Sequence, residues 1–77
     1  MKVKVIVTLK EGVLDPQGKA IQQTLNGMNF DNVIEVRQGK FFEIEVSEND
    51  ESKAKTLVDD MCKKLLTNLV IEDYKII

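Results

Sequence analysis

The chain has 77 residues and a formal net charge of −2, with 11 basic and 13 acidic side chains, one cysteine and no histidine. This size predicts a single domain, residues 1–77, with a thin core. Small domains of this kind are commonly stabilised further by oligomerisation. The charge balance argues against nucleic-acid binding, and the cysteine and histidine counts exclude an intrachain disulfide, thiol–imidazole catalysis and the usual zinc sites. The alternating N-terminal residues argue against a signal peptide, and no apolar run is long enough to cross a membrane, so we expect a cytoplasmic protein.

The first predicted element is a strand over residues 2–10. Its β-branched residues recur with a period of two, which is typical of a half-buried strand. The polar face contains one apolar exception, Ile6. The apolar face is made of Val3, Val5, Val7 and Leu9.

The stretch Gly12–Gly18 links this strand to a predicted helix over residues 17–26. Asp15 suits the N-cap, and Pro16 suits the first helical position because its missing N–H costs nothing there. Gly18 weakens the first turn by roughly 1 kcal/mol relative to Ala, which indicates that another part of the chain packs closely there. The glycine spacing and the absence of Ser or Thr after Lys19 argue against a phosphate-binding loop.

Helical spacing predicts that the first helix turns an apolar side to the core. Gly27 suits a left-handed position after the helix, and Phe30 is expected to fill the core. The apolar side consists of Ile21, Leu25 and Met28.

A second strand is predicted over residues 33–37 and a third over 40–46, joined by a tight turn at Gln38-Gly39. Arg37 and Lys40 then flank the tip of a β-hairpin. That tip is either a site for a phosphate or a partner's acidic group, or simply a polar turn.

Residues 47–50 begin a second helix, with Ser or Asn as its cap and acidic residues in the first turn. A last strand is predicted over residues 70–77. A wide apolar stripe marks the core-facing side of the helix: Ala54, Leu57, Val58, Met61, Cys62, Leu65 and Leu66.

The order β-α-β-β-α-β predicts an α+β, ferredoxin-like fold, with a four-stranded antiparallel sheet and two helices on one face. The first and third strands are then central, antiparallel neighbours. A register pairing Lys2 with Glu45 and Lys4 with Glu43 matches opposite charges and sets Ile6 opposite Phe41. On the open face, Ile6 and Phe41 form either a contact surface or scattered surface apolar residues.

The candidate chemical groups form no catalytic set. Cys62 lies on the apolar stripe and no base is present to activate it, so we expect a buried structural thiol. The carboxylates between Glu43 and Glu51 alternate on a strand or begin a helix, which favours solvated charge over a metal site. We therefore expect a binding or assembly module.

Several segments resemble the PurS subunits of phosphoribosylformylglycinamidine synthase. Leu69 stands where that family usually has proline before the last strand, which predicts a less rigid turn. The matching segments are GVLDPQG (residues 12–18), VIEVRQGK (33–40), Glu43, CKKLL (62–66) and VIEDY (70–74), together with shorter stretches at 7–10 and 20–21.

The resemblance implies a non-catalytic assembly subunit in de novo purine synthesis. Such a subunit bridges PurL, an ATP-dependent synthetase subunit, and PurQ, a glutaminase subunit, so that glutamine-derived ammonia reaches formylglycinamide ribonucleotide. The complex uses ATP, magnesium and glutamine, and no catalytic, cofactor-binding or metal-binding residue is expected in this subunit. An alternative is a regulatory βαββαβ domain that senses a small molecule bound between subunits near the first helix.

We expect a homodimer or a dimer of dimers, because the core is thin and Ile6 and Phe41 are apolar on an open face. No nucleic-acid or membrane partner is expected. The predicted interface residues are Ile6, Asp15, Pro16, Gln17, Gly18, Arg37, Gly39, Lys40 and Phe41.

Overall fold

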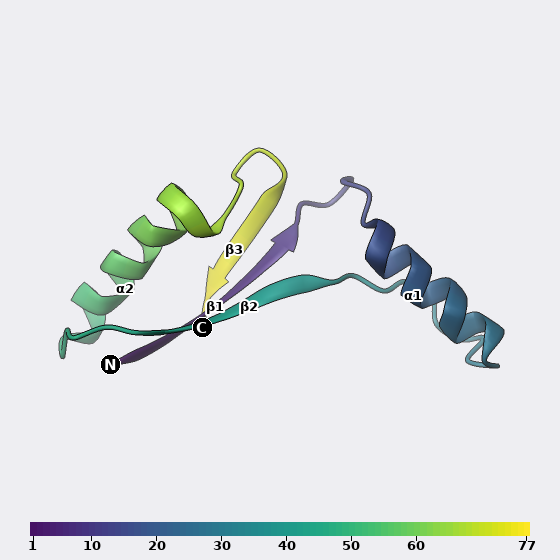
Figure 1. Ribbon diagram of the computed structural model, residues 1–77, viewed down its shortest axis with the longest axis horizontal. Coiled ribbons are helices and arrows are strands. Elements are labelled where there is room, and N and C mark those ends of the chain that lie inside the picture. Colours follow the sequence, from purple (N-terminus) through teal and green to yellow (C-terminus); the bar gives the residue numbers. More distant parts are fainter.

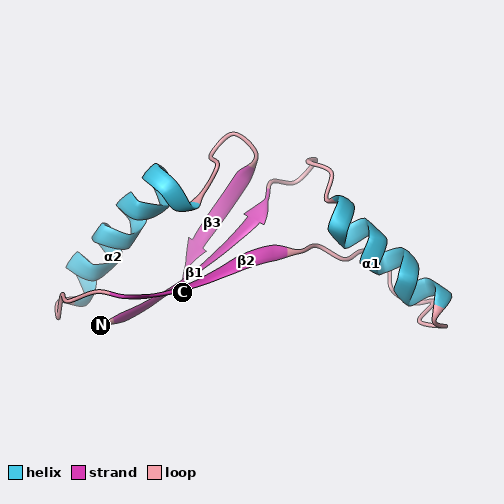
Figure 2. Ribbon diagram, in the orientation of Figure 1, coloured by secondary structure: helices cyan, strands magenta, loops and turns pink.

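The computed structural model describes residues 1–77 as two helices and three strands (Figure 2). A π-helical turn, η1 (Cys62–Leu66), continues the second helix. Neither helix is both long and apolar enough to cross a bilayer. In chain order the elements are β1 (Lys2–Leu9), α1 (Pro16–Gly27), β2 (Gly39–Glu45), α2 (Glu51–Met61) and β3 (Glu72–Ile76).

The three strands form one antiparallel sheet in the order β2-β1-β3. The predicted register is confirmed, since Lys2 lies opposite Glu45, Lys4 opposite Glu43 and Ile6 opposite Phe41. The salt bridge runs diagonally, from Lys2 Nζ to Glu43 Oε1 at 3.2 Å. Cross-strand charge pairing and β-branched alternation thus specify β1 and β2 as predicted.

The prediction of a strand over residues 33–37 and a tight turn at Gln38-Gly39 is wrong for the single chain. Residues 33–38 belong to no sheet, and Gly39 is the first residue of β2, opposite Thr8. After α1 the chain returns alongside the helix and enters β2 without reversing direction (Figure 1). A single copy therefore has three strands rather than four.

Helix α1 does not cover the sheet, contrary to prediction. It projects away from the sheet with the returning chain beside it (Figure 1). We call residues 12–38 the arm and the remainder the body. The radius of gyration is 15.9 Å, whereas a compact chain of this length has about 11 Å. The molecule measures 48 × 24 × 14 Å, so the arm gives it a strongly elongated shape.

The core lies between α2 and one face of the sheet. Only 9 of 77 residues are buried, so the single copy has little apolar surface removed from water. Phe30, at the end of the arm, is 51% exposed and does not fill this core. The buried apolar residues are Val3, Val5, Val7, Ala54, Val58 and Cys62.

The apolar stripe of α2 is narrower than predicted. Ala54, Val58 and Cys62 are buried, but Leu57 is 47% exposed and Leu65 is 83% exposed. The π-helical turn widens the helix end, so that Thr67 N–H donates to the carbonyl of Cys62, five residues earlier. One flank of the predicted stripe therefore lies outside the core of the single chain.

Two helix ends differ from prediction. Asp50, rather than Ser or Asn, caps α2 by accepting a hydrogen bond from the N–H of Lys53 at 3.2 Å. Gly27 stays within α1, and the left-handed conformation falls on Asn29, with φ of 73°. Asn is among the non-glycine residues that tolerate this conformation best.

The thiol of Cys62 should resist modification in the folded protein. Its side chain is fully buried, and burial, then the negative charge of Asp59, raise its pKa. Because the thiolate is the reactive form, we expect no reaction with a thiol reagent such as DTNB at pH 8, and one thiol per chain in denaturant. Rapid reaction of the native protein would contradict this placement.

Candidate functional site

The joint between the arm and the body is organised around Asp15. Its Oδ1 accepts a hydrogen bond from the N–H of Gly18 at 2.8 Å, as the predicted N-cap does. Its Oδ2 accepts a second from the N–H of Gln38 at 2.7 Å. One carboxylate therefore connects the start of α1 with the chain that returns to β2.

These contacts hold Asp15 in its charged form. The N–H of Gln38, followed by that of Gly18, lowers the pKa of the carboxyl group, while desolvation acts in the opposite direction. The residue is buried, with 9% of its surface exposed. Because backbone donors occupy both oxygens, Asp15 is positioned as a structural acceptor and not as a general base.

Arg37 connects the returning chain to the end of β1. Its Nη2 donates to the carbonyl oxygens of Leu9 at 2.8 Å and Lys10 at 3.2 Å. The N–H of Lys10 donates to the carbonyl of Ile71 at 2.8 Å, which continues the connection into the body. Arg37 therefore binds backbone of its own chain. The sequence had left three roles open for this tip: binding a phosphate, binding a partner's acidic group, or forming a plain polar turn.

Gly18 confirms the close approach predicted from its place in the first helical turn. A Cβ atom there would lie 2.2 Å from the carbonyl oxygen of Val36 and 2.7 Å from Asp15 Oδ2. The first distance involves backbone, which cannot move aside as a flexible side chain can. The returning chain thus packs directly on the backbone of α1.

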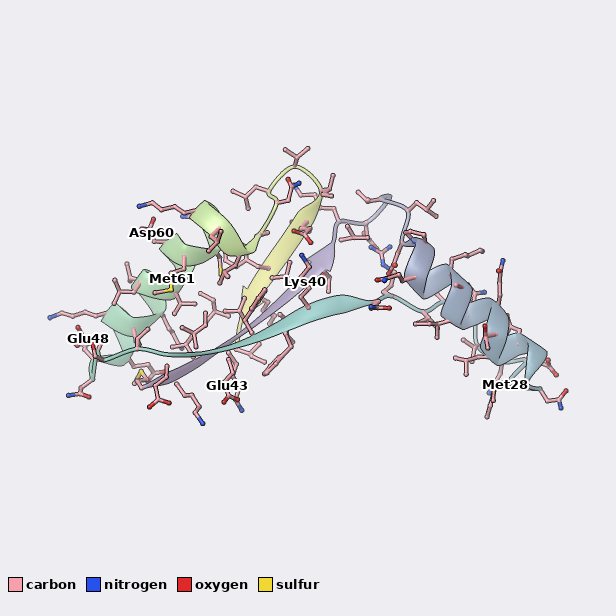
Figure 3. The ribbon with its side chains drawn as sticks, in the orientation of Figure 1. Met28, Lys40, Glu43, Glu48, Asp60 and Met61 are labelled. Carbon is pink, nitrogen blue, oxygen red and sulfur yellow. The ribbon has the colours of Figure 1, made fainter.

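Seven of the nine predicted interface residues gather around this joint. A cavity of about 240 Å³ lies there, on the face of the sheet that also carries the core. Lys40, which Figure 3 labels on the body side of the joint, lies 3.6 Å from Glu72, a partner the sequence did not indicate. The gathered residues are Asp15, Pro16, Gln17, Gly18, Arg37, Gly39 and Lys40.

Ile6 and Phe41 lie on the opposite face of the sheet. They are direct cross-strand partners and are 37% and 57% exposed. Glu43, two residues along β2 from Phe41, points away from α2 (Figure 3). The predicted residues therefore divide into a joint and a separate apolar pair, and their role as an interface stays a prediction.

The arm exposes apolar residues of the predicted first helix and the predicted second strand. Ile34 is 89% exposed, Met28 is 59% exposed and Ile21 is 41% exposed. Met28 marks the far end of the arm (Figure 3). Between α1 and the segment Ile34–Arg37 the arm has a cavity of about 410 Å³. The sequence predicts a strand over residues 33–37, and this segment forms none in the single chain.

A polar cluster joins β3 to the end of α2. The hydroxyl of Tyr74 donates to Asp59 Oδ1, and Lys63 Nζ lies 3.0 Å from Asp59 Oδ2. The Tyr74 hydroxyl, then Lys63, lowers the pKa of Asp59. No group of three or more His, Cys, Asp or Glu residues that could hold a metal ion is present.

Stability should fall at acid pH because Asp15 and Asp59 both have lowered pKa values in the folded state. The unfolded chain then binds more protons as the pH approaches and passes below about 3.9, the ordinary Asp value. We expect a nearly constant free energy of unfolding between about pH 7 and 5 and a decline below about pH 4. Urea titrations check this. Asp15→Asn should show a shallower decline, and an unchanged decline would contradict its contribution.

Comparisons with known proteins identify the family. Residues 2–77 match the family model described as PurS, phosphoribosylformylglycinamidine (FGAM) synthase. The PurS subunit of Bacillus subtilis is 51% identical over 96% of this chain and 87% of its own length. The solved structure of Methanocaldococcus jannaschii PurS is 50% identical, with a TM-score of 0.88 over 99% of this chain and 92% of that one.

A chain of the solved PurLQS structure from Thermotoga maritima is 32% identical, with a TM-score of 0.90 over 99% of this chain and 93% of that one. These relatives do not favour the alternative of a ligand-sensing regulatory domain. The matched residues and the shared fold both extend over nearly the whole chain, and the protein therefore belongs to the PurS family of FGAM synthase subunits.

Proposed function

We propose that this protein is the non-catalytic assembly subunit of FGAM synthase, bridging a PurL-type synthetase and a PurQ-type glutaminase in the cytoplasm. The similarity to a chain of a PurLQS structure supports this role. The occupied carboxylate of Asp15 and the buried thiol of Cys62 are consistent with a subunit that has no catalytic residues. ATP, magnesium and glutamine then bind to the other subunits, and this chain carries no cofactor.

We also propose that the protein forms a homodimer, and the arm indicates how that dimer forms. The TM-scores of 0.88 and 0.90 over 99% of this chain mean that solved relatives share the extended arm. An elongated element that buries so little of its own apolar surface needs a partner surface. We infer that two copies exchange arms around a two-fold axis, which is a low-cost route to a dimer.

The observation that carries this inference is the 89% exposure of Ile34. Its segment enters β2 without reversing direction (Figure 1). The predicted hairpin of residues 33–46 is open in this chain, so residues 33–37 extend away from β2 and are free to pair with another copy. Residues 33–37 of the partner then lie along β2 of this chain. Ile34 is an even number of residues from Phe42 and Ile44, so in one extended strand all three side chains point to the same face. Phe42 and Ile44 pack against the core, and we therefore expect Ile34 to be buried in the dimer.

Arm exchange completes the ferredoxin-like fold. The partner's residues 33–37 supply the fourth strand, and its α1 covers the part of the sheet that α2 leaves open. The apolar side of α1, with Ile21, Leu25 and Met28, then packs against that sheet. Each half of the dimer has the predicted four strands and two helices, made from two chains.

Reconstitution tests the assembly role. The protein is mixed with PurL and PurQ from the same organism, glutamine and magnesium nucleotide. Co-elution and glutamine-dependent FGAM synthesis are then measured with and without this chain. We expect a stable complex and a synthesis rate that depends on the chain, whereas ammonia-dependent synthesis by PurL should change little. A full glutamine-dependent rate in its absence would refute the bridging role.

A further inference from the structure

The arm projects from the body without packing on it (Figure 1). No extensive contact links α1 to any strand or to α2. The covalent connections are two single chain segments, one near Gly12 and one at Gln38-Gly39. Gly12 has φ of +84°, a conformation that is easy for glycine and breaks regular structure. Without further contacts, the arm would pivot about these two segments.

Three sets of contacts oppose such a pivot. Asp15 binds the N–H groups of Gly18 at 2.8 Å and Gln38 at 2.7 Å, and so joins the outgoing and returning chains. Arg37 joins the returning chain to the carbonyls of Leu9, the last residue of β1, and Lys10, which follows it. The close backbone contact at Gly18 leaves little space for the two chains to slide.

The two side chains act at different sides of the joint. Asp15 holds the arm together at its base, while Arg37 attaches that base to the body through Leu9 and Lys10. Both bind backbone groups, of which the Gly18 N–H belongs to α1 and the Leu9 carbonyl to β1. We propose that Asp15 and Arg37 form an orientation clamp, which fixes the direction of the arm before a second copy binds.

A pre-oriented arm changes how two copies associate. Ordering a mobile arm at the moment of binding costs entropy, and orienting it beforehand reduces that cost. A fixed direction also favours reciprocal exchange between two copies over open chains of many copies. This consequence for assembly rests on the arm exchange proposed above, whereas the orientation itself is a property of one copy.

The orientation is best measured on a single copy. Spin labels on cysteines introduced at Asp31, at the arm tip, and Ser52, on α2, report the arm-to-body distance by pulsed electron resonance. Cys62 is fully buried and stays unlabelled. The measurement is made in the Ile34→Lys background, where the exchange interface is disrupted. The clamp variants are Asp15→Asn and Arg37→Lys, and Asp60→Asn is the matched control for loss of a carboxylate charge.

We expect a single narrow distance with the clamp intact and in the control, and a distribution at least roughly twofold broader in each clamp variant. In the otherwise native chain, each clamp variant should weaken dimerisation by about tenfold or more and increase higher oligomers. Far-UV circular dichroism confirms that the variants keep their helices. Near-UV spectra report on the packing of the body through the single tyrosine, Tyr74.

The outcomes separate the two proposals. A broad distribution with the clamp intact, or narrow distributions in both variants, would overturn the orientation clamp. A native chain that stays monomeric while its distance distribution is narrow would refute arm exchange and leave the clamp standing. If both clamp variants dimerise with the same dissociation constant as the native chain, the clamp has no role in assembly.

Discussion

Ile34→Lys is expected to prevent the proposed dimer from forming and to leave a monomer. Ile34 is 89% exposed in the single chain, so the substitution costs little there. In the proposed arm-exchanged dimer the same side chain would be buried, and burying an isoleucine contributes about 1.5–3 kcal/mol. An unpaired buried ammonium adds several kcal/mol of desolvation cost. A two-fold symmetric dimer contains the substituted side chain twice, so both costs apply twice. The dissociation constant should therefore rise by at least about a thousandfold.

The measurement combines sedimentation with thermal unfolding. Wild-type protein should melt at a temperature that rises with protein concentration, because dimerisation stabilises the folded state by mass action. The Ile34→Lys protein should sediment as a monomer and lose that concentration dependence. Val70→Lys is the matched control, because Val70 is 83% exposed and lies in the body, outside the exchanged segments. If both variants remain dimeric, the arm is not exchanged.

The helices and strands that the structure contains were predictable from sequence, because each depends on local chemistry. The alternation of Val3, Val5 and Val7 specifies a half-buried strand in any copy of the chain. Asp15 and Pro16 begin α1 as expected, since their effect depends only on the backbone beside them. The register of β1 and β2 followed from opposite charges and from the core face of each strand.

The arrangement was not predictable, because local patterns do not say which copy of a segment pairs with a strand. Alternation over residues 33–37 indicates an extended, half-buried segment, and that holds whether the neighbour is in the same chain or in a partner. Gln38-Gly39 fits a tight turn and an extended passage equally well, because glycine is permissive in both. The predicted core side of α1 is likewise exposed in one chain, with Ile21 41% exposed.

The sequence identified individual residues of the candidate site, but it did not identify the contacts that they make. The turn chemistry singled out Asp15 as a cap, and the position of Gly18 indicated close packing. Nothing in the sequence showed that the second oxygen of Asp15 binds Gln38, which is 23 residues away. Nor did it show that Arg37 binds backbone carbonyls at the end of β1. Long-range contacts to backbone leave no residue pattern at the partner, because every residue offers the same N–H and carbonyl groups.

The largest expected effect within the arm comes from a single methyl group at Gly18. Gly18→Ala places a Cβ 2.2 Å from the carbonyl oxygen of Val36, so α1 and the returning chain must separate. Such overpacking costs about 1–3 kcal/mol, and the separation also breaks the Asp15 contacts on either side. We expect a lower melting temperature, a weaker dimer and faster hydrogen exchange at the Gln38 amide.

Gly27→Ala in the same helix provides the control, with the opposite expected sign. A Cβ there meets nothing within 4 Å, and Gly27 does not have positive φ. Alanine should therefore stabilise the helix by about 0.5–1 kcal/mol, because glycine loses more conformational freedom on folding. Equal destabilisation by the two substitutions would mean that helix propensity, and not the contact with Val36, governs the arm. Opposite shifts, with exchange at Gln38 accelerated only by Gly18→Ala, would locate the effect at the joint, where the returning chain crosses the first turn of α1.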